Sequence, residues 1–218
     1  MLTIGMLHST RMVIDAVHSA VVSSCRDIDI LHVMDEGLLR ALKREGSIGP
    51  EMTEWMTAMV KSLERQGAEL ALVSCSSLSP CVNDIQKAVG IPVLKIDEPM
   101  IEWAVNHAAS IGLVMTNPTT EGPSNLLISE VSQRTGRHPS VLSRVCPEAF
   151  WKLNAGDCEG HDAEVVRVVH ELLHSVDVVI LAQISIARVL ANFDETIRPK
   201  VLSSLDFIGP KIQQILSA

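Results

Sequence analysis

Short apolar runs alternate along this chain with longer stretches in which apolar residues recur every three or four positions. The short runs predict β-strands that are buried on both faces, and the longer stretches predict amphipathic helices. The predicted strands cover residues 2–7, 28–34, 69–74, 92–95, 111–116, 139–143, 177–182 and 200–202. The predicted helices cover residues 12–24, 51–66, 80–89, 98–108, 122–135, 161–175, 185–192 and 205–217. Regular strand–helix alternation is typical of an α/β fold with parallel sheets.

The strand pattern occurs twice. Leu2–Leu7 returns as Ser110–Met115, and Ala71–Leu78 returns as Val179–Ile186, at offsets of 107 or 108 residues. A third run, at residues 91–94, returns near residues 198–202. An offset of half the chain predicts two halves with one topology.

We therefore expect two pseudo-symmetric parallel-sheet α/β domains with the active site in the cleft between them. The first domain is expected to contain residues 1–97 and 204–218, because nothing in the second half requires the final helix. The second domain is expected to cover residues 98–203.

Composition and charge restrict the class of ligand. The 218 residues are 47% hydrophobic, which is enough for one large core or two modest ones. The net charge is −8 and basic residues are scattered, so the sequence argues against nucleic acid and favours a small ligand. No apolar run approaches the roughly 18–20 residues of a membrane helix. Five cysteines without a CxxC pair, and a start without a secretory pattern, predict a cytoplasmic location.

Polar residues gather where the predicted strands end. In open parallel sheets ligands bind beyond the carboxyl ends of the strands, where helix N-termini offer free N–H groups. Hydroxyl groups and backbone donors suit a small carboxylate. The residues expected to bind it are Ser9, Thr10, Ser76, Ser77, Thr116, Asn117, Thr119 and Ser185. The alternative is that these residues only cap helices.

Cys75 and His8 are the chemically reactive residues in these loops. Cys75 lies between a buried strand and a helix start, where the helix dipole favours thiolate, so we expect a depressed thiol pKa. The alternative is a small buried hydrophobic residue. His8 is interpreted either as a ligand contact or proton relay, or as an ordinary surface residue. The other four cysteines are interpreted as structural.

One motif indicates different chemistry. His170-Glu171-Leu172-Leu173-His174 is a literal HExxH, whose histidines can bind zinc on one helix face. However, the valines and leucines of this helix form its buried stripe, which leaves His170, Glu171 and His174 on the solvent side. No third ligand is evident, so we expect no metal site here.

The sequence resembles the aspartate/glutamate/hydantoin racemase superfamily in its two half-repeats, in the cysteine after the third strand and in the matching turn at Gln183. This superfamily also includes maleate isomerase and arylmalonate decarboxylase. The resemblance implies two pseudo-symmetric domains, a small carboxylate substrate, no metal, no organic cofactor and a possible homo-oligomer. Family racemases use two cysteines on opposite faces of the substrate carbon. Cys75 matches the first, and Gln183 occupies the position of the second.

This departure leaves several functions open, because glutamine can donate a hydrogen bond but cannot take a proton at neutral pH. Cys75 can add to a double bond and permit cis/trans isomerisation, as in maleate isomerase. It can protonate the product of a decarboxylation, as in the arylmalonate enzyme. His8 can act as a second base and preserve racemisation. A protein that binds a carboxylate without catalysis is the remaining alternative.

Overall fold

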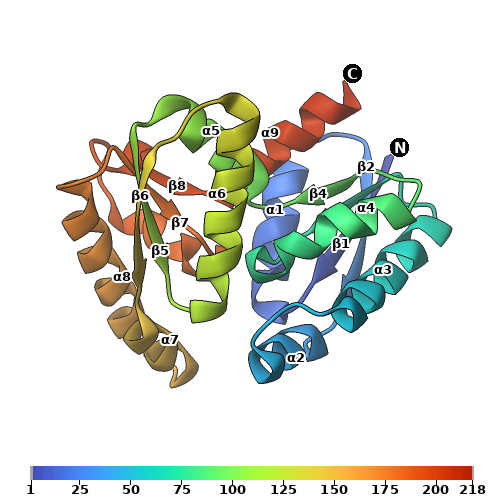
Figure 1. The fold of residues 1–218 in the computed structure, drawn as a ribbon, viewed down its shortest axis with the longest axis horizontal. Coiled ribbons are helices and arrows are strands. Elements are labelled where there is room, and N and C mark those ends of the chain that lie inside the picture. The colour runs from blue at the N-terminus through green and yellow to red at the C-terminus, as the bar shows by residue number, and fades with distance from the viewer. Residues whose placement is uncertain (1, 218) are drawn as a thin grey trace. The chain divides into compact units, whose positions relative to one another are not determined.

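The computed structural model describes residues 2–217, which form two compact units. The first unit contains the chain up to Glu98 together with the segment from Phe207 onward, and the second is Pro99–Asp206. Each unit contains a four-stranded parallel sheet with helices around it (Figure 1). The predicted α/β fold class is confirmed.

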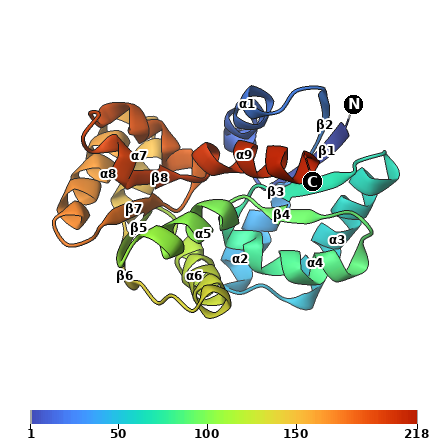
Figure 2. The same cartoon turned by 90° about the horizontal axis from the view of Figure 1, so that it is seen from above.

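The sheet of the first unit has the strand order β2-β1-β3-β4, and every strand pair is parallel. The strands are β1 (Leu2–His8), β2 (Ile28–Met34), β3 (Leu70–Val73) and β4 (Val93–Lys95). The helices are α1 (Ile14–Ser24), α2 (Gly37–Glu45), α3 (Pro50–Arg65), α4 (Val82–Ala88) and, from Phe207, α9 (Ser204–Leu216), with 3-10 turns η1 (Arg11–Val13) and η2 (Ser76–Cys81). Figure 2 shows α1 and α9 on one face of this sheet and α3 and α4 on the other.

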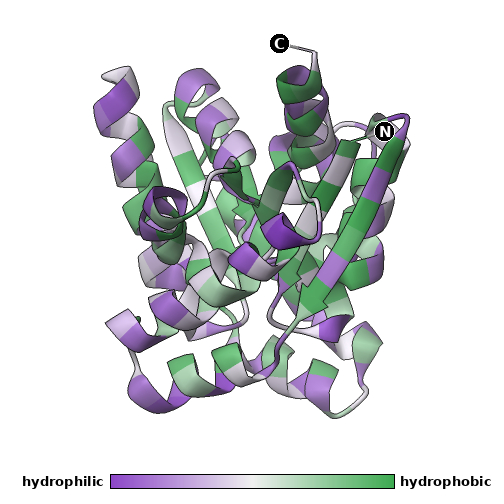
Figure 3. Cartoon of the chain, turned by 90° about the vertical axis from the view of Figure 1, so that its right-hand side faces the viewer, coloured by the Kyte–Doolittle hydropathy of each residue, from purple (hydrophilic) through white to green (hydrophobic). Residues whose placement is uncertain are grey.

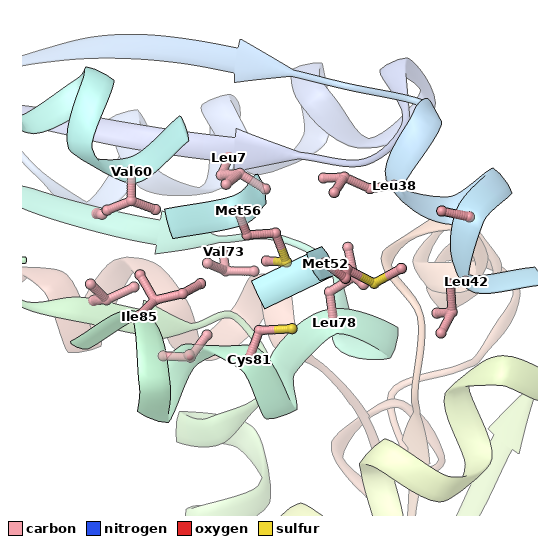
Figure 4. Close-up of a cluster of buried hydrophobic side chains, with 14 residues drawn as sticks. Leu7, Leu38, Leu42, Met52, Met56, Val60, Val73, Leu78, Cys81 and Ile85 are labelled. Carbon is pink, nitrogen blue, oxygen red and sulfur yellow. The ribbon is translucent and has the colours of Figure 1, made fainter. Parts of the chain in front are cut away.

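One hydrophobic cluster of the first unit lies between the sheet and α3. Met52, Met56 and Val60 of α3 are buried one helical turn apart and pack with sheet residues such as Leu7 and Val73 (Figure 4). Gly5 of β1 allows this close approach, because a Cβ atom there would lie 2.9 Å from the Leu63 side chain. Pro50 at the first helical position fixes the helix start without losing a hydrogen bond.

The sheet of the second unit has the equivalent strand order β6-β5-β7-β8, again with parallel pairs. The strands are β5 (Ser110–Met115), β6 (Ser140–Val145), β7 (Val178–Leu181) and β8 (Val201–Ser203). The helices are α5 (Glu98–His107), α6 (Glu121–Thr135), α7 (Pro147–Asn154) and α8 (Cys158–Leu173), with 3-10 turns η3 (Pro118–Thr120), η4 (Ile184–Asn192) and η5 (Arg198–Lys200). The buried stripe of α8, which includes Val165, Val169 and Leu172, packs on this sheet.

The two units match residue by residue at the ends of their central strands. The Ser74 N–H donates to the Leu7 carbonyl oxygen at 3.0 Å, and the Ala182 N–H donates to the Val114 carbonyl oxygen at 2.9 Å. Cys75 and Gln183, the next residues in each case, therefore occupy equivalent positions in their own sheets.

All eight predicted strands are present, but two helices were not predicted. Helices α2 and α7 have 9 and 8 residues, which is shorter than the window of roughly 11 residues that a helical period needs to be recognised. The predicted helix 80–89 begins earlier, as η2, and the predicted helix 185–192 is the 3-10 turn η4. The buried strands are largely hydrophobic, whereas the helices alternate between polar and apolar residues (Figure 3). No helix within residues 2–217 has the length and apolar character to cross a membrane.

Candidate functional site

Three adjacent strands of the first unit place Ser9, Cys75 and Asp97 in one row. Leu7 pairs with Val73, and Val73 pairs with Lys95, in the register of the parallel sheet. Ser9, Cys75 and Asp97 each lie two residues after one of these paired positions. Because parallel strands end at the same edge of a sheet, the row lies where α/β proteins bind ligands.

The Cys75 sulfur is held by hydrogen-bond donors, yet burial dominates its ionisation. The Ser9 hydroxyl and the N–H groups of Leu78 and Ser77 lower the pKa of the thiol. Burial raises it by more, and the negative charge of Asp97 raises it further, so the net pKa of Cys75 is above its ordinary value. The predicted depression of the thiol pKa is therefore wrong for this structure, because the donors of a short turn do not offset desolvation.

Asp97 was missed by the sequence reasoning. Its side chain is 2% exposed, and the Ser79 hydroxyl donates to Oδ1 at 2.8 Å. Its Oδ2 atom has no hydrogen-bond partner among the residues that the structure describes. Burial raises the pKa of Asp97 to about 6, although Ser79, Ser76 and the Lys95 charge lower it. The available clue was its place immediately beyond β4, two residues after a buried lysine.

A chain of three histidines lies beside this row. The His8 ring is 2.7 Å from the Ser74 hydroxyl through Nδ1 and 2.9 Å from His32 Nδ1 through Nε2. His32 Nε2 is in turn 3.0 Å from His18 Nδ1. His18 and His32 are exposed, whereas His8 has 0% exposure. The chain therefore runs from solvent to a fully buried ring.

One set of tautomers satisfies every bond in this chain. The Ser74 hydroxyl donates to the Leu7 carbonyl oxygen at 3.1 Å, so it accepts from His8 Nδ1–H. His8 Nε2 then accepts from His32 Nδ1–H, and His32 Nε2 accepts from His18 Nδ1–H. Burial and the neighbouring His32 lower the pKa of His8 to about 4, so His8 is neutral at pH 7. The alternative interpretation of His8 as an ordinary surface residue is wrong, because the ring is buried.

In the second unit, the Gln183 side chain is bound to the loop that follows β5. Its Oε1 atom accepts from the Thr116 N–H at 2.6 Å, the Thr116 hydroxyl at 3.2 Å and the Asn117 N–H at 3.1 Å. From the sequence, Thr116 and Asn117 were instead predicted to bind a substrate carboxylate. The amide oxygen of Gln183 therefore occupies a place that suits an anion.

The remaining predicted residues divide into caps and buried hydroxyls. Thr10 and Asn117 act as N-caps, since Thr10 Oγ1 accepts from the Met12 N–H at 3.4 Å and Asn117 Oδ1 accepts from the Thr119 N–H at 3.3 Å. Ser9, Ser76 and Ser77 are buried in the first unit, as Thr116 and Asn117 are in the second. Thr119 and Ser185 are partly exposed.

The HExxH helix is arranged as the sequence pattern predicts. His170 and Glu171 of α8 and His174, the C-cap residue that follows it, are exposed, and Glu171 pairs with Arg167 on the same helix. His170 packs beside the Phe193 ring, with centroids 5.6 Å apart. Residues 2–217 contain no cluster of three His, Cys, Asp or Glu side chains suited to a metal ion.

The other cysteines differ from Cys75 in their surroundings, and all five are free thiols. Cys25, Cys81 and Cys146 are buried, and burial raises the pKa of Cys146 to about 11. Cys158 is partly exposed at the start of α8 and hydrogen-bonds with Arg188, which also contacts Asp162 at 3.1 Å. Cys158 is thus a useful reference thiol outside the row that contains Cys75.

Parallel sheets that present thiol, hydroxyl and amide groups at the carboxyl ends of their strands are typical of α/β proteins that bind small molecules there. Residues 7–208 match the family model described as Asp/Glu/Hydantoin racemase. The chain therefore belongs to the Asp/Glu/hydantoin racemase family, and an isomerase of the racemase type is the enzyme class that this membership supports. A search among curated proteins finds no match.

Solved structures of racemases have the same fold. Glutamate racemase RacE1 from Bacillus anthracis matches with a TM-score of 0.74 and 19% identity, over 99% of this chain and 82% of that one. An aspartate racemase homologue from Pyrococcus horikoshii matches with a TM-score of 0.74 and 16% identity, over 100% of both chains. Allantoin racemase from Klebsiella pneumoniae matches with a TM-score of 0.71 and 13% identity, over 100% of this chain and 88% of that one. At these identities the likeness concerns the fold.

Proposed function

We propose that the protein is a cofactor-independent isomerase of the racemase type that acts on a small carboxylate through a single thiol, Cys75. The observation that carries this proposal is the setting of the Cys75 sulfur. Cys75 is partly exposed at the carboxyl end of β3. The Ser9 hydroxyl and two backbone N–H groups lower the pKa of its thiol and so oppose the larger increase that burial causes. Donors already in place at a sulfur stabilise thiolate when it forms, without reorganisation at that moment.

The proposed chemistry requires both a proton acceptor and stabilisation of negative charge. A proton next to a carboxylate is weakly acidic, so its removal depends on donors that hold the developing enolate. Cys75 is the proposed nucleophile or acid–base group, and Gln183 contributes hydrogen bonding rather than proton transfer. His8 is proposed as a proton relay, since it ends a hydrogen-bonded chain that begins at exposed His18. The proposed substrate contacts are Ser9, Thr10, Ser76, Ser77, Thr116, Asn117, Thr119 and Ser185.

Proton NMR in D2O tests the proposal directly. The panel contains aspartate, glutamate, a 5-substituted hydantoin, maleate and an arylmalonate, each with wild type, Cys75→Ala and the matched control Cys158→Ala. We expect either deuterium uptake at the α-carbon or conversion of maleate to fumarate, lost in Cys75→Ala and retained in Cys158→Ala. Loss of carbon dioxide from the arylmalonate would identify a decarboxylase instead. Activity that survives Cys75→Ala would contradict the role of the thiol.

A second candidate function is a protein that binds a carboxylate without turnover. The observation that favours it is the Gln183 amide oxygen, which already satisfies the Thr116 and Asn117 donors. Isothermal titration separates the two candidates. Binding of a carboxylate together with no Cys75-dependent reaction across the panel would favour the binding protein, whereas turnover of any member would exclude it.

A further inference from the structure

The loop after β5 contains backbone donors that lie beyond the end of the sheet. β5 ends at Met115, and the neighbouring strand β7 ends at Leu181. Thr116 and Asn117 come next in the chain, and both residues are buried. Their N–H groups need an acceptor, because a buried donor without one is destabilising.

The Gln183 side chain supplies this acceptor, although its chemistry matches the donors imperfectly. Three donors converge on Gln183 Oε1, namely the N–H groups of Thr116 and Asn117 at 2.6 and 3.1 Å and the Thr116 hydroxyl at 3.2 Å. An amide oxygen has only two lone pairs, whereas a carboxylate offers about four acceptor sites and a negative charge. Hydrogen bonds from neutral donors to a charged acceptor are also stronger. The donors therefore suit a carboxylate better than they suit the amide.

We propose that Gln183 is an internal substitute for a ligand carboxylate, and that a small carboxylate binds these three donors when the Gln183 side chain turns away. Gln183 is partly exposed, so part of the residue is already in contact with solvent. The inference rests on the part of the proposed function that assigns carboxylate binding to Thr116 and Asn117. It does not depend on catalysis by Cys75.

This internal contact sets a threshold for binding to the second unit. A neutral carbonyl group that replaces the Gln183 oxygen makes hydrogen bonds no stronger than those that it displaces. A carboxylate makes charge-assisted bonds of roughly twice the strength. The internal oxygen lowers the apparent affinity of every external acceptor by the same factor, because only the open state binds. A carboxylate therefore still binds measurably where a neutral acceptor does not.

Acetate and acetamide test the proposal, because Gln183→Ala removes a group with the size and shape of acetamide. In isotope-labelled protein, the amide signals of Thr116 and Asn117 report binding in an NMR titration at pH 7 and constant ionic strength. We expect acetate to bind Gln183→Ala about tenfold more tightly than wild type, because the internal competitor is gone. Acetamide should bind that variant about tenfold more weakly than acetate.

Two further variants locate the bound acetate. Gln183→Glu keeps an acceptor oxygen on the donors and should bind acetate no better than wild type does. Gln183→Ala/Thr116→Val removes the hydroxyl donor but keeps both N–H groups, so acetate should bind about fivefold more weakly than to Gln183→Ala. An unchanged affinity in this double variant would place acetate elsewhere and overturn the inference.

The remaining outcomes separate this inference from the proposed catalysis. Equal acetate affinity in wild type and Gln183→Ala, or equal affinity of acetate and acetamide in Gln183→Ala, would overturn the inference and leave Cys75-dependent turnover unaffected. Tight acetate binding without turnover of any panel member would support the inference and remove the catalytic function. If Gln183→Ala is largely unfolded, refolding by acetate but not by acetamide is the equivalent readout, and refolding by neither contradicts the inference.

Discussion

The strand-end positions of the two units share a backbone frame and differ in chemistry. Equivalent hydrogen bonds from Ser74 and Ala182 align the central strands, and the pairings of Val73 with Lys95 and Leu181 with Ser203 align the next strands. The equivalent pairs, first unit before second, are His8 and Met115, Ser74 and Ala182, Cys75 and Gln183, and Asp97 and Leu205. At each of these positions the second unit has a side chain that does not titrate near neutral pH. The comparison teaches that proton chemistry is concentrated in one unit, while the other retains hydrogen bonding.

The largest effect is expected from removing the thiol. Cys75→Ala should lower any turnover by on the order of 10³-fold or more, because it deletes the proposed nucleophile or base. The measurement is the deuterium-exchange or isomerisation rate by NMR, with the melting temperature as a folding control. Equal rates in Cys75→Ala and wild type would show that the Cys75 thiol of the first unit does not catalyse the reaction.

Asp97→Asn should make the first unit more stable at neutral pH. Burial raises the pKa of Asp97 from 3.8 to about 6 in the folded protein. The protonated side chain therefore contributes to the free energy of unfolding fully below pH 3.8, and this contribution is lost as the pH rises through 6. The ionised carboxyl therefore costs up to about 3 kcal/mol at pH 7.5, and less than about 1 kcal/mol at pH 4. Urea unfolding at both pH values measures the difference. A stability loss at pH 7.5 would mean that Asp97 is stabilised as an anion.

Gln183 should stabilise the second unit through its amide oxygen. Gln183→Ala leaves the buried Thr116 and Asn117 donors unsatisfied, so we expect the free energy of unfolding to fall by about 1–3 kcal/mol. Gln183→Glu provides the matched control, since a carboxylate oxygen accepts from the same donors and should retain the stability at pH 7. Urea unfolding of the three proteins measures this. Equal losses in both variants would show that these hydrogen bonds do not hold the loop.

The last comparison concerns the histidine chain. The pKa of His8 is lowered to about 4, so the neutral ring contributes stability above pH 6.5 that is lost as the pH falls toward 4. Between pH 7 and pH 5 this loss amounts to about 2 kcal/mol. His8→Met introduces the residue found at the equivalent position of the second unit and should remove that part of the acid sensitivity. Urea unfolding of both proteins at pH 7 and pH 5 tests this prediction. If the free energy of unfolding changes equally with pH in both, groups other than His8 cause the acid sensitivity.

Periodicity was sufficient to predict the strands, because the central strands are apolar at nearly every position. The expected burial on both faces is wrong for the edge strands β2 and β6, which contain no fully buried residue. It did not identify α2 or α7, which are too short to display a helical period. Position after a strand was enough to single out Cys75. Asp97 and the His18–His32 contact depend on strand register and on a helix packing against the sheet, which no local pattern contains. The thiol pKa was misjudged because its balance of burial and donors requires three-dimensional surroundings.

The last helix has a consequence for how the chain reaches its fold during synthesis. From Phe207, α9 belongs to the first unit, where Ile208 and Ile212 are fully buried and the Gly209 carbonyl oxygen accepts from the Cys25 thiol at 3.7 Å. The ribosome makes these residues after the whole of the second unit. The second unit can therefore complete its core as it emerges, whereas the first must keep an apolar face uncovered until α9 has been synthesised. The unit that carries Cys75 is thus the later of the two to become fully folded.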